Sequence, residues 1–224
     1  MIALFDLDGT VLTFDGAAPG PGRTAMGRAS RELYGDDHTQ GIRFAGGTDR
    51  AIARALLDRA GLPFDEDKVQ ALIDRYLEHL EVELARRPYR AIGDVAGTVT
   101  ACTERGARVG LATGNVRRGA AIKLASAGLG DVFDLSRGGY GCDHEVRAEV
   151  VRIAIARCGR EGPVVVVGDT LQDVAAARAA GAHAVGVAVN QATRDELIAA
   201  GADAIVDRCD RALVDALFRV AAWR

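Results

Sequence analysis

Lysine is nearly absent from this chain of 224 residues, in which Lys68 and Lys123 are the only two and arginine supplies the remaining positive charge. The formal net charge is −3 at pH 7, so the chain has no basic field that would bind nucleic acid. It also lacks an apolar run of membrane length and opens without a basic leader. We therefore predict a cytoplasmic protein with no nucleic-acid or membrane partner.

Cysteine is also scarce, and its spacing excludes two further classes of protein. The chain has four cysteines and no CxxC pair, at Cys102, Cys142, Cys158 and Cys209. That spacing favours reduced thiols over a zinc site or a disulfide framework. The composition, 49% hydrophobic and 26% charged, is that of an ordinary soluble globular protein. The length suits one large domain, or a core with a smaller insert.

The first ten residues carry the most informative pattern. Residues 2–5 form a continuous apolar run, as expected for a strand buried on both faces. Asp6 and Asp8 follow, and because side chains alternate along a strand, both should point to one side while Leu7 faces the core. Gly9 then allows a sharp turn. Two like charges so close together need a cation or a shared proton; a strand that merely ends in a polar turn is the alternative.

Residues 15–22 are rich in glycine and proline and are typical of a loop or linker. From residue 23 to residue 87 the apolar spacing is helical, and no segment reads as a strand. The elements predicted here are a strand arm over 11–14 and helices over 23–34, 49–60 and 65–86. Thr48 is placed to cap the second helix, and Pro88 ends the third. We predict a helical domain over residues 15–87.

Beyond Pro88, helices and strands alternate. The predicted strands are 107–112, 132–135, 164–167 and 184–189. The predicted helices are 92–105, 117–127, 145–158 and 174–180, and two more helices flank 204–206. Asn190 and Gln191 are predicted to lie in a loop. This alternation predicts an α/β fold with a doubly wound parallel sheet, Rossmann-like, with helices on both faces. Residues 1–14 and 88–224 would form this core domain, into which 15–87 is inserted.

Polar residues directly follow several of these apolar runs. They are Asp6 and Asp8 after the first strand, Thr113, Gly114 and Asn115 after a second, Asp169 and Asp173 after a third, and Arg147 at the start of a helix between them. In open α/β sheets ligands bind beyond the carboxyl ends of the strands. We therefore expect these side chains to converge on one edge of the sheet and to form one site.

In this order and spacing the chain resembles the haloacid dehalogenase-like superfamily, whose members are mostly phosphohydrolases. The family's Asp-x-Asp-Gly-Thr motif is matched by residues 6–10, its strand-ending Ser or Thr by Thr113, and its Gly-Asp-x-x-x-Asp motif by residues 168–173. A third motif is usually a lysine. Here Arg147 is the best substitute, with a helix-surface arginine as the alternative. The helical insert corresponds to the family's first type of cap.

A phosphate monoester is a dianion, and each unit repulsion at 4 Å costs roughly 4 kcal/mol at an effective dielectric constant near 20. A carboxylate can therefore attack phosphorus only where cations cancel this repulsion. Mg²⁺, a hard ion that prefers oxygen ligands, fits Asp6 and Asp169. The resemblance adds the backbone carbonyl of Asp8. Asp173 would lie near the ion or bind it through water, with simple capping of the next helix as the alternative.

The predicted reaction is the hydrolysis of a phosphate monoester of a small metabolite. Asp6 would attack phosphorus to give an aspartyl-phosphate, and Asp8 would act as general acid and then as general base. Thr113 and Arg147 would hold the phosphoryl oxygens. Substrate-binding residues are predicted at Gly9, Thr10, Gly114 and Asn115, and in the insert at Thr48 and Asp49.

Specificity is the least constrained part of the sequence. Residues 46–49 resemble a cap loop of phosphoglycolate phosphatase-like members, and Arg43 or Arg50 could meet an anionic substrate. The alternative is that Thr48 and Asp49 only begin a helix. No pattern predicts an oligomeric state.

Three other functions compete with a phosphatase. A haloacid dehalogenase would attack carbon and needs neither a metal nor an acid at position 8, so Asp8 and Asp169 argue against it. A phosphomutase of the β-phosphoglucomutase type keeps the same motifs. A phospho-accepting receiver domain would be shorter, would lack the helical insert and would need a lysine after a later strand.

Overall fold

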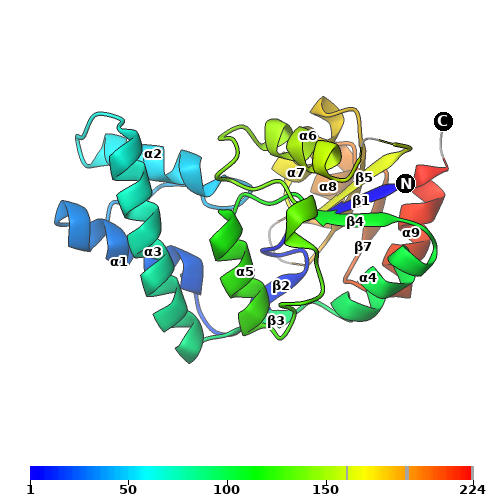
Figure 1. Cartoon of the computed structure of the whole chain (residues 1–224), viewed down its shortest axis with the longest axis horizontal. Helices are drawn as coiled ribbons and strands as arrows, with labels where there is room; N and C mark the ends of the chain where they lie inside the picture. Colours follow the sequence, from blue (N-terminus) through cyan, green and yellow to red (C-terminus); the bar gives the residue numbers. More distant parts are fainter. Residues whose placement is uncertain (160, 190–191, 223–224) are drawn as a thin grey trace.

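The computed structural model describes residues 1–159, 161–189 and 192–222 (Figure 1). Its centre is a parallel sheet of five strands in the order β4-β1-β5-β6-β7. The strands are β1 (Ile2–Phe5), β4 (Arg108–Leu111), β5 (Val164–Gly168), β6 (His183–Val187) and β7 (Ala204–Val206). The predicted α/β fold with a parallel, Rossmann-like sheet is confirmed. The predicted loop at Asn190 and Gln191 lies outside the described residues.

Helices cover both faces of this sheet, and β1 shows how. Its side chains alternate: Ala3 and Phe5 belong to one buried cluster, and Ile2 and Leu4 to the other. The first cluster includes residues of α4 (Val95–Glu104), α5 (Arg117–Ser126) and α9 (Arg211–Ala221). The second includes residues of α6 (Arg147–Arg157), α7 (Leu171–Ala179) and α8 (Arg194–Ala199). A strand buried on both sides explains the unbroken apolar run at the start of the sequence.

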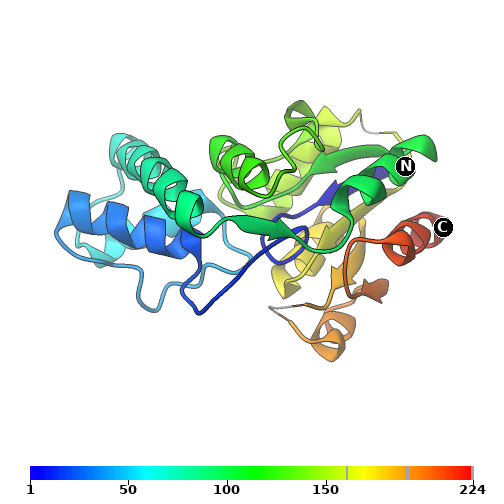
Figure 2. The same cartoon turned by 90° about the horizontal axis from the view of Figure 1, so that it is seen from below.

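The segment between the first strand and Pro88 is helical, as predicted. It contains α1 (Pro21–Tyr34), α2 (Asp49–Arg59) and α3 (Glu66–Arg86). These three helices gather at one end of the molecule, away from the C-terminus (Figures 1 and 2). α3 packs on both α1 and α2 and also touches α5 of the core. We retain the division into a helical domain over 15–87 and an α/β core as a proposal.

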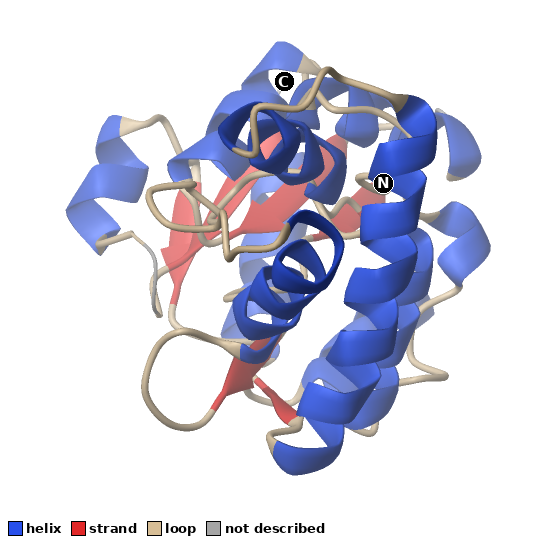
Figure 3. Cartoon of the chain, turned by 90° about the vertical axis from the view of Figure 1, so that its left-hand side faces the viewer, coloured by secondary structure: helices blue, strands red, loops and turns tan. Residues whose placement is uncertain are grey.

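A small ribbon joins the two ends of the helical segment to the rest of the chain. β2 (Leu12–Phe14) pairs in antiparallel fashion with β3 (Tyr89–Ala91), and the pair stands apart from the main sheet (Figure 3). The arm predicted over 11–14 is therefore a strand whose partner is β3. β3 is not predicted from the sequence, because a strand of three residues is too short to show a period.

The strand predicted over Val132–Leu135 is wrong. Residues 132 and 133 lie in a turn that leads into a short 3₁₀-helix, Leu135–Arg137. The Asp134 carboxylate accepts a hydrogen bond from the Ser136 amide and holds that turn. Phe133 is buried edge-on against the Phe5 ring, with the ring centroids 5.8 Å apart. An apolar anchor inside a turn thus gave the same pattern as a short buried strand.

Several predicted helix ends shift by a few residues for reasons visible at their caps. α4 begins at Val95 rather than at residue 92, because the Asp94 carboxylate accepts from the Gly97 amide. α7 begins at Leu171, three residues earlier than predicted.

All four cysteines are free thiols, and Cys142 alone among them is exposed. Among the described residues, no helix combines the length and the hydropathy that a membrane crossing requires.

Candidate active site

The carboxyl ends of three neighbouring strands bring the predicted acidic residues together. In the sheet, Phe5 lies opposite Leu111 on one side and Val167 on the other. The residues just beyond these positions, Asp6 among them, therefore meet at one edge, as predicted. Carboxylate oxygens of Asp6, Asp169 and Asp173 lie within 4.8 Å of one another, and all three residues are buried.

Arg147 is the cation that faces this cluster. Its Nη2 lies 2.6 Å from Asp6 Oδ1 and 2.8 Å from Asp173 Oδ1, and the side chain is only 10% exposed. Burial alone would lower the pKa of Arg147, but the charges of Asp6 and Asp173 raise it above its usual range. Arg147 is therefore a buried ion-pair partner in the site and not a helix-surface arginine.

Asp169 is the least compensated of the three carboxylates. Its Oδ2 is buried and has no hydrogen-bond partner among the described residues, while Thr10 Oγ1 donates to Oδ1 over 3.4 Å. Burial, together with the nearby charges of Asp6 and Asp173, raises the pKa of Asp169 to about 9. Gly9 adopts φ +84°, and a Cβ there would lie 1.9 Å from Asp169 Oδ2. The glycine of the first motif is therefore required by the close approach of this carboxylate.

The cluster has the composition of a site for a hard divalent cation. Three carboxylates face one guanidinium, so two negative charges stay unbalanced when all three are ionised. Burial raises the pKa of Asp6 to about 6, although Arg147 lowers it and Asp173 and Asp8 raise it further. Clustered carboxylate oxygens are the donors that Mg²⁺ prefers. The residues present therefore fit a divalent ion.

Asp173 has two contacts at once. One oxygen, Oδ2, accepts from Thr170 N at 3.1 Å and from Thr170 Oγ1 at 2.6 Å. The bond from Thr170 N, together with the bond from Asp173 N to Thr170 Oγ1 at 3.3 Å, forms a capping box at the start of α7. The other oxygen, Oδ1, faces Arg147. The two roles considered from the sequence, helix capping and a place beside the ion site, are thus combined in one side chain.

Asp8 has a different environment from the other acids. Lys123 Nζ lies 2.9 Å from Oδ1 and 2.7 Å from Oδ2, and Asn115 Nδ2 donates to Oδ2 over 2.7 Å. Burial raises the pKa of Asp8, but the charge and hydrogen bonds of Lys123 and the hydrogen bond of Asn115 outweigh it and lower that pKa. Asn115 Nδ2 also lies 2.8 Å from Thr113 Oγ1, so the loop after β4 is tied to Asp8.

Lys123 is a site residue that no sequence pattern predicts. It lies on α5 and is 4% exposed, and lysine is almost never so buried without a partner. Lys123 is one of only two lysines in the chain, but the residues around it in the sequence form no recognisable motif. Only the packing of α5 over the strand ends brings it to Asp8.

The insert docks on the core through residues 46–49. Thr48 caps α2 by accepting from Ala51 N, and it also donates to the Glu145 carbonyl over 3.0 Å. Asp49 donates its amide to the Gly114 carbonyl at 2.7 Å, and its Oδ2 accepts from Val116 N at 2.8 Å. Thr48 and Asp49 thus begin a helix and contact the core at the same time. Their contact with a substrate stays a prediction, although burial raises the pKa of Asp49 to about 6.

Glu145 holds the same junction together. Its carboxylate binds Arg50 Nε at 3.2 Å and Arg54 Nη2 at 2.8 Å, and both arginines lie on α2. Arg50 also pairs with Glu66. Arg50 therefore pairs with carboxylates of the protein instead of lining the cavity, which leaves Arg43 as the predicted cation for an anionic substrate.

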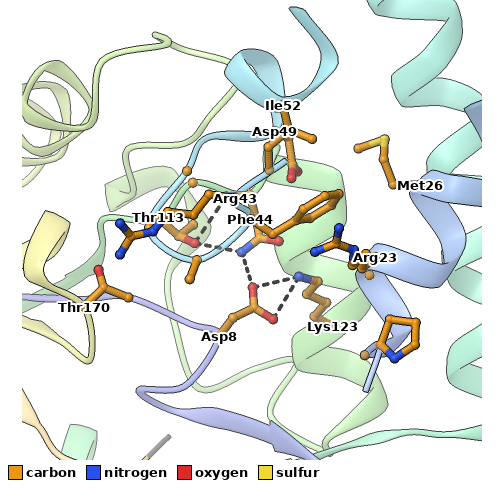
Figure 4. A pocket seen from close by; sticks show the side chains of 18 of the residues that line it. Asp8, Arg23, Met26, Arg43, Phe44, Asp49, Ile52, Thr113, Lys123 and Thr170 are labelled. Atoms are coloured by element: carbon orange, nitrogen blue, oxygen red, sulfur yellow. Dashed lines mark hydrogen bonds and ion pairs between the residues drawn. The ribbon is translucent and has the colours of Figure 1, made fainter. Parts of the chain in front are cut away.

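A cavity of about 440 Å³ lies between the insert and the strand ends. Asp6, Asp8, Thr113 and Arg147 line it from the core, and Arg23, Met26, Phe44 and Ile52 line it from the insert (Figure 4). Gly114, Asn115 and Asp49 also face it. Gly9 and Thr10, which were predicted to bind substrate, lie against Asp169, so that role stays a prediction.

Comparisons with known proteins agree with this geometry. A family model described as haloacid dehalogenase-like hydrolase matches residues 1–181. A protein of Dickeya dadantii (strain 3937) described as probable phosphatase IndB is 28% identical over 209 residues, which are 92% of this chain and 89% of that protein.

Solved structures share the fold at low sequence identity. A predicted phosphatase from Clostridium acetobutylicum has a TM-score of 0.68 at 19% identity, covering 97% of this chain and 98% of that one. CbbY from Rhodobacter sphaeroides, solved in complex with phosphate, has a TM-score of 0.66 at 17% identity, covering 94% and 96%. These likenesses show a shared fold.

Proposed function

The chain belongs to the haloacid dehalogenase-like hydrolases, and from that premise we propose that it is a Mg²⁺-dependent phosphatase acting on a phosphate monoester of a small metabolite. One observation carries this proposal. Three buried carboxylates cluster at the strand ends, where one guanidinium pairs with Asp6 and Asp173, and the third carboxylate, Asp169, has an oxygen without a partner among the described residues. A divalent cation would balance the two excess charges and remove the repulsion that keeps a dianionic substrate away.

The ion would be held by the carboxylates of Asp6 and Asp169 and the backbone carbonyl of Asp8, with Asp173 nearby. Bound there, Mg²⁺ would neutralise and orient the oxygens of the phosphoryl group. Arg147 is placed to share that task, because it already lies between Asp6 and Asp173 at the edge of the cavity.

Asp6 is the proposed nucleophile. Its Oδ1 accepts from Arg147, so the guanidinium fixes the carboxylate with its other oxygen available for attack on phosphorus. The new bond joins Asp6 to phosphorus while the bond from phosphorus to the leaving oxygen breaks, which gives an aspartyl-phosphate. Thr113, whose hydroxyl is held by Asn115, and the backbone at Gly114 would hold the phosphoryl oxygens.

Asp8 is the proposed proton carrier. In the free protein Asp8 is a carboxylate, and it takes up a proton when the negative charge of a bound phosphate monoester raises its pKa. In the first step it gives that proton to the leaving oxygen. It is then the carboxylate that Lys123 and Asn115 stabilise, and in that form it takes a proton from the water that attacks phosphorus. Breaking of the bond between Asp6 and phosphorus returns the free carboxylate and releases phosphate.

The alternatives differ in what they need from these residues. A dehalogenase would attack carbon through Asp6 and has no use for the paired Asp8 or for Asp169. A phosphomutase would use the same groups but would return the phosphoryl group to the substrate. Chloride release without Mg²⁺ favours the first alternative, and isomerisation of a sugar phosphate without release of phosphate favours the second.

The proposal is tested by a screen of phosphate monoesters with the wild type and with Asp6→Asn, each with and without Mg²⁺. We expect phosphate release that requires Mg²⁺ and falls by at least about 10³-fold in the variant, since losing a covalent nucleophile removes most of the rate enhancement. Turnover that is unchanged in Asp6→Asn rejects this carboxylate as the nucleophile.

A further inference from the structure

Arg23 on α1 projects into the cavity from the insert. In Figure 4 its guanidinium lies beside the Phe44 ring, on the far side of Lys123 from Thr113 and Thr170. It is half-buried. A substrate whose phosphoryl group sits at the strand ends would therefore extend its leaving group toward this arginine.

The other cations of the cavity's inner wall already have anionic partners. Arg147 is bound by Asp6 and Asp173, and Lys123 by Asp8. Arg43 is exposed and turns toward the neutral side chain of Gln172, at 3.3 Å. Among the described residues, no carboxylate lies within 4.0 Å of Arg23. Arg23 is therefore the half-buried cation of the cavity that has no ion pair.

The contacts of Arg23 hold it without neutralising it. Nη2 donates to the Thr39 carbonyl at 2.6 Å, and Nη1 is 3.4 Å from the Ile42 carbonyl. The guanidinium carbon lies 4.8 Å from the centre of the Phe44 ring. The Asp37 carboxylate is near enough for the charge of Arg23 to help lower its pKa, but it accepts its hydrogen bonds from Thr39 and forms no ion pair with Arg23 within 4.0 Å. A guanidinium has five N–H donors, so donors remain for a ligand.

An arginine fixed in this way is suited to a planar or tetrahedral anion, because its donors are already oriented and a weakly hydrated guanidinium loses little on binding. A half-buried charge that lines a cavity and has no carboxylate in contact gains from a ligand that supplies an anionic group. We propose that Arg23 is a specificity-determining residue that binds a second anionic group, carboxylate or phosphate, on the leaving group of the substrate. This inference rests on the proposed phosphatase activity.

The test uses pairs of phosphate esters that differ only in that second group. The pairs are phosphoglycolate with 2-hydroxyethyl phosphate, 3-phosphoglycerate with glycerol 3-phosphate, and fructose 1,6-bisphosphate with fructose 6-phosphate. The first two pairs test recognition of a carboxylate in substrates of two lengths, and the third pair tests recognition of a second phosphate. In at least one pair we expect the wild type to prefer the more acidic ester in kcat/KM by at least about tenfold, mainly through KM, as for a hydrogen bond to a charged group.

Arg23→Gln should abolish that preference and leave the turnover of the neutral partner within about threefold, since a lost binding contact raises KM and leaves kcat. Arg31→Gln is the matched control, because Arg31 is an exposed arginine of the same helix. Arg23→Lys keeps the charge and should retain part of the preference, which separates lost recognition from a disturbed loop at Thr39 and Ile42.

Binding is measured in parallel by calorimetry on Asp6→Asn and on Asp6→Asn/Arg23→Gln, so that turnover is not needed. Tighter binding of an acidic ester that disappears with Arg23 supports the inference. No preference in any pair, no binding of any ester, or a preference that survives Arg23→Gln overturns it. If the wild type releases phosphate but shows no preference in any pair, this inference alone is overturned. If it releases phosphate from none of the esters, the proposed function is overturned, and the calorimetry decides whether Arg23 binds an anionic group.

Discussion

Lys123 holds Asp8 by both oxygens: its ammonium nitrogen lies 2.9 Å from Oδ1 and 2.7 Å from Oδ2. The contact joins α5 to the turn after β1, over 115 positions in the chain. Burial alone would lower the pKa of Lys123, but the negative charge of Asp8 raises it well above its usual value. In the free protein the pair is therefore charged, and Asp8, the proton carrier of the proposed mechanism, is fixed in one orientation.

Lys123→Met should lower kcat by about 10- to 100-fold, because general acid–base catalysis contributes about 10²- to 10⁴-fold and depends on orientation. Losing the ammonium group also removes the interaction that lowers the pKa of Asp8. That pKa then rises, and because Asp8 must be ionised to act as the base in the hydrolysis of the aspartyl-phosphate, the acidic limb of the pH–rate profile for that step should move to higher pH. Steady-state kinetics between pH 5 and pH 9 measures both effects.

Lys68→Met is the natural control, since Lys68 is the other lysine of the chain and reaches only Asp65, at 3.8 Å on the surface of the insert. It should behave as the wild type. Equal losses in the two variants, or a profile that does not move in Lys123→Met, would contradict the role given to the Lys123–Asp8 pair.

Gly114 marks the place where the insert and the core touch backbone to backbone. A Cβ at this position would lie 1.9 Å from the Gly47 carbonyl oxygen and 2.6 Å from Arg147 Nη1. Gly114→Ala should therefore push residues 46–49 away and lower kcat/KM by at least about tenfold, as expected when a small misplacement disturbs a catalytic geometry.

Gly130→Ala is a matched substitution, because the nearest atom to a Cβ there is 3.8 Å away. It should keep full activity and stability. Urea unfolding of both variants tells a local displacement from a general loss of stability. Full activity in Gly114→Ala would show that the docking of the insert on this loop is not needed for turnover.

The raised pKa of Asp169 provides a stability test of the proposed metal site. That pKa is about 9 in the folded protein and about 4 for an unperturbed Asp. Between about pH 4 and about pH 9 the folded state therefore keeps a proton that the unfolded chain has lost. Stability that this group contributes is present at low pH and is lost as the pH rises toward 9 in the absence of metal. A bound divalent cation should restore it.

In metal-free buffer at pH 8, Asp169→Asn should therefore raise the melting temperature, by about 2–4 °C for each kcal/mol recovered in a chain of this size. The variant should also lose the stabilisation that Mg²⁺ gives to the wild type. Differential scanning fluorimetry from pH 5 to pH 9, with and without Mg²⁺, reads both effects. A wild-type melting temperature that Mg²⁺ does not change would argue against an ion at this cluster.

The parts of the site that the sequence predicted are those with a local signature. Asp6 and Asp169 each follow an apolar strand, and parallel strands must end at one edge, so their meeting follows from pattern and topology together. Arg147 is predicted through the resemblance, as the substitute for the lysine of the third motif, and the structure places it against Asp6. For these residues the neighbouring sequence is sufficient evidence.

The remaining parts depend on packing between distant segments. Lys123 has no motif of its own and reaches Asp8 only through the placement of α5. Residues 89–91 become a strand only because β2 pairs with them. Phe133 lies in a short apolar run that is typical of a strand, although it belongs to a turn and packs against Phe5. The contacts of Arg23 likewise involve a loop 16 to 19 residues away, which no periodicity reveals.

The most direct test is to find the phosphoryl group on the protein. The wild type is mixed with Mg²⁺ and a phosphate monoester that it hydrolyses, quenched in acid within the first turnover, digested and examined by mass spectrometry. We predict a phosphoryl group on Asp6 in the peptide that contains residues 1–10, and none in Asp6→Asn. Phosphate release without any labelled carboxylate, at a rate that Asp6→Asn leaves unchanged, would contradict the account.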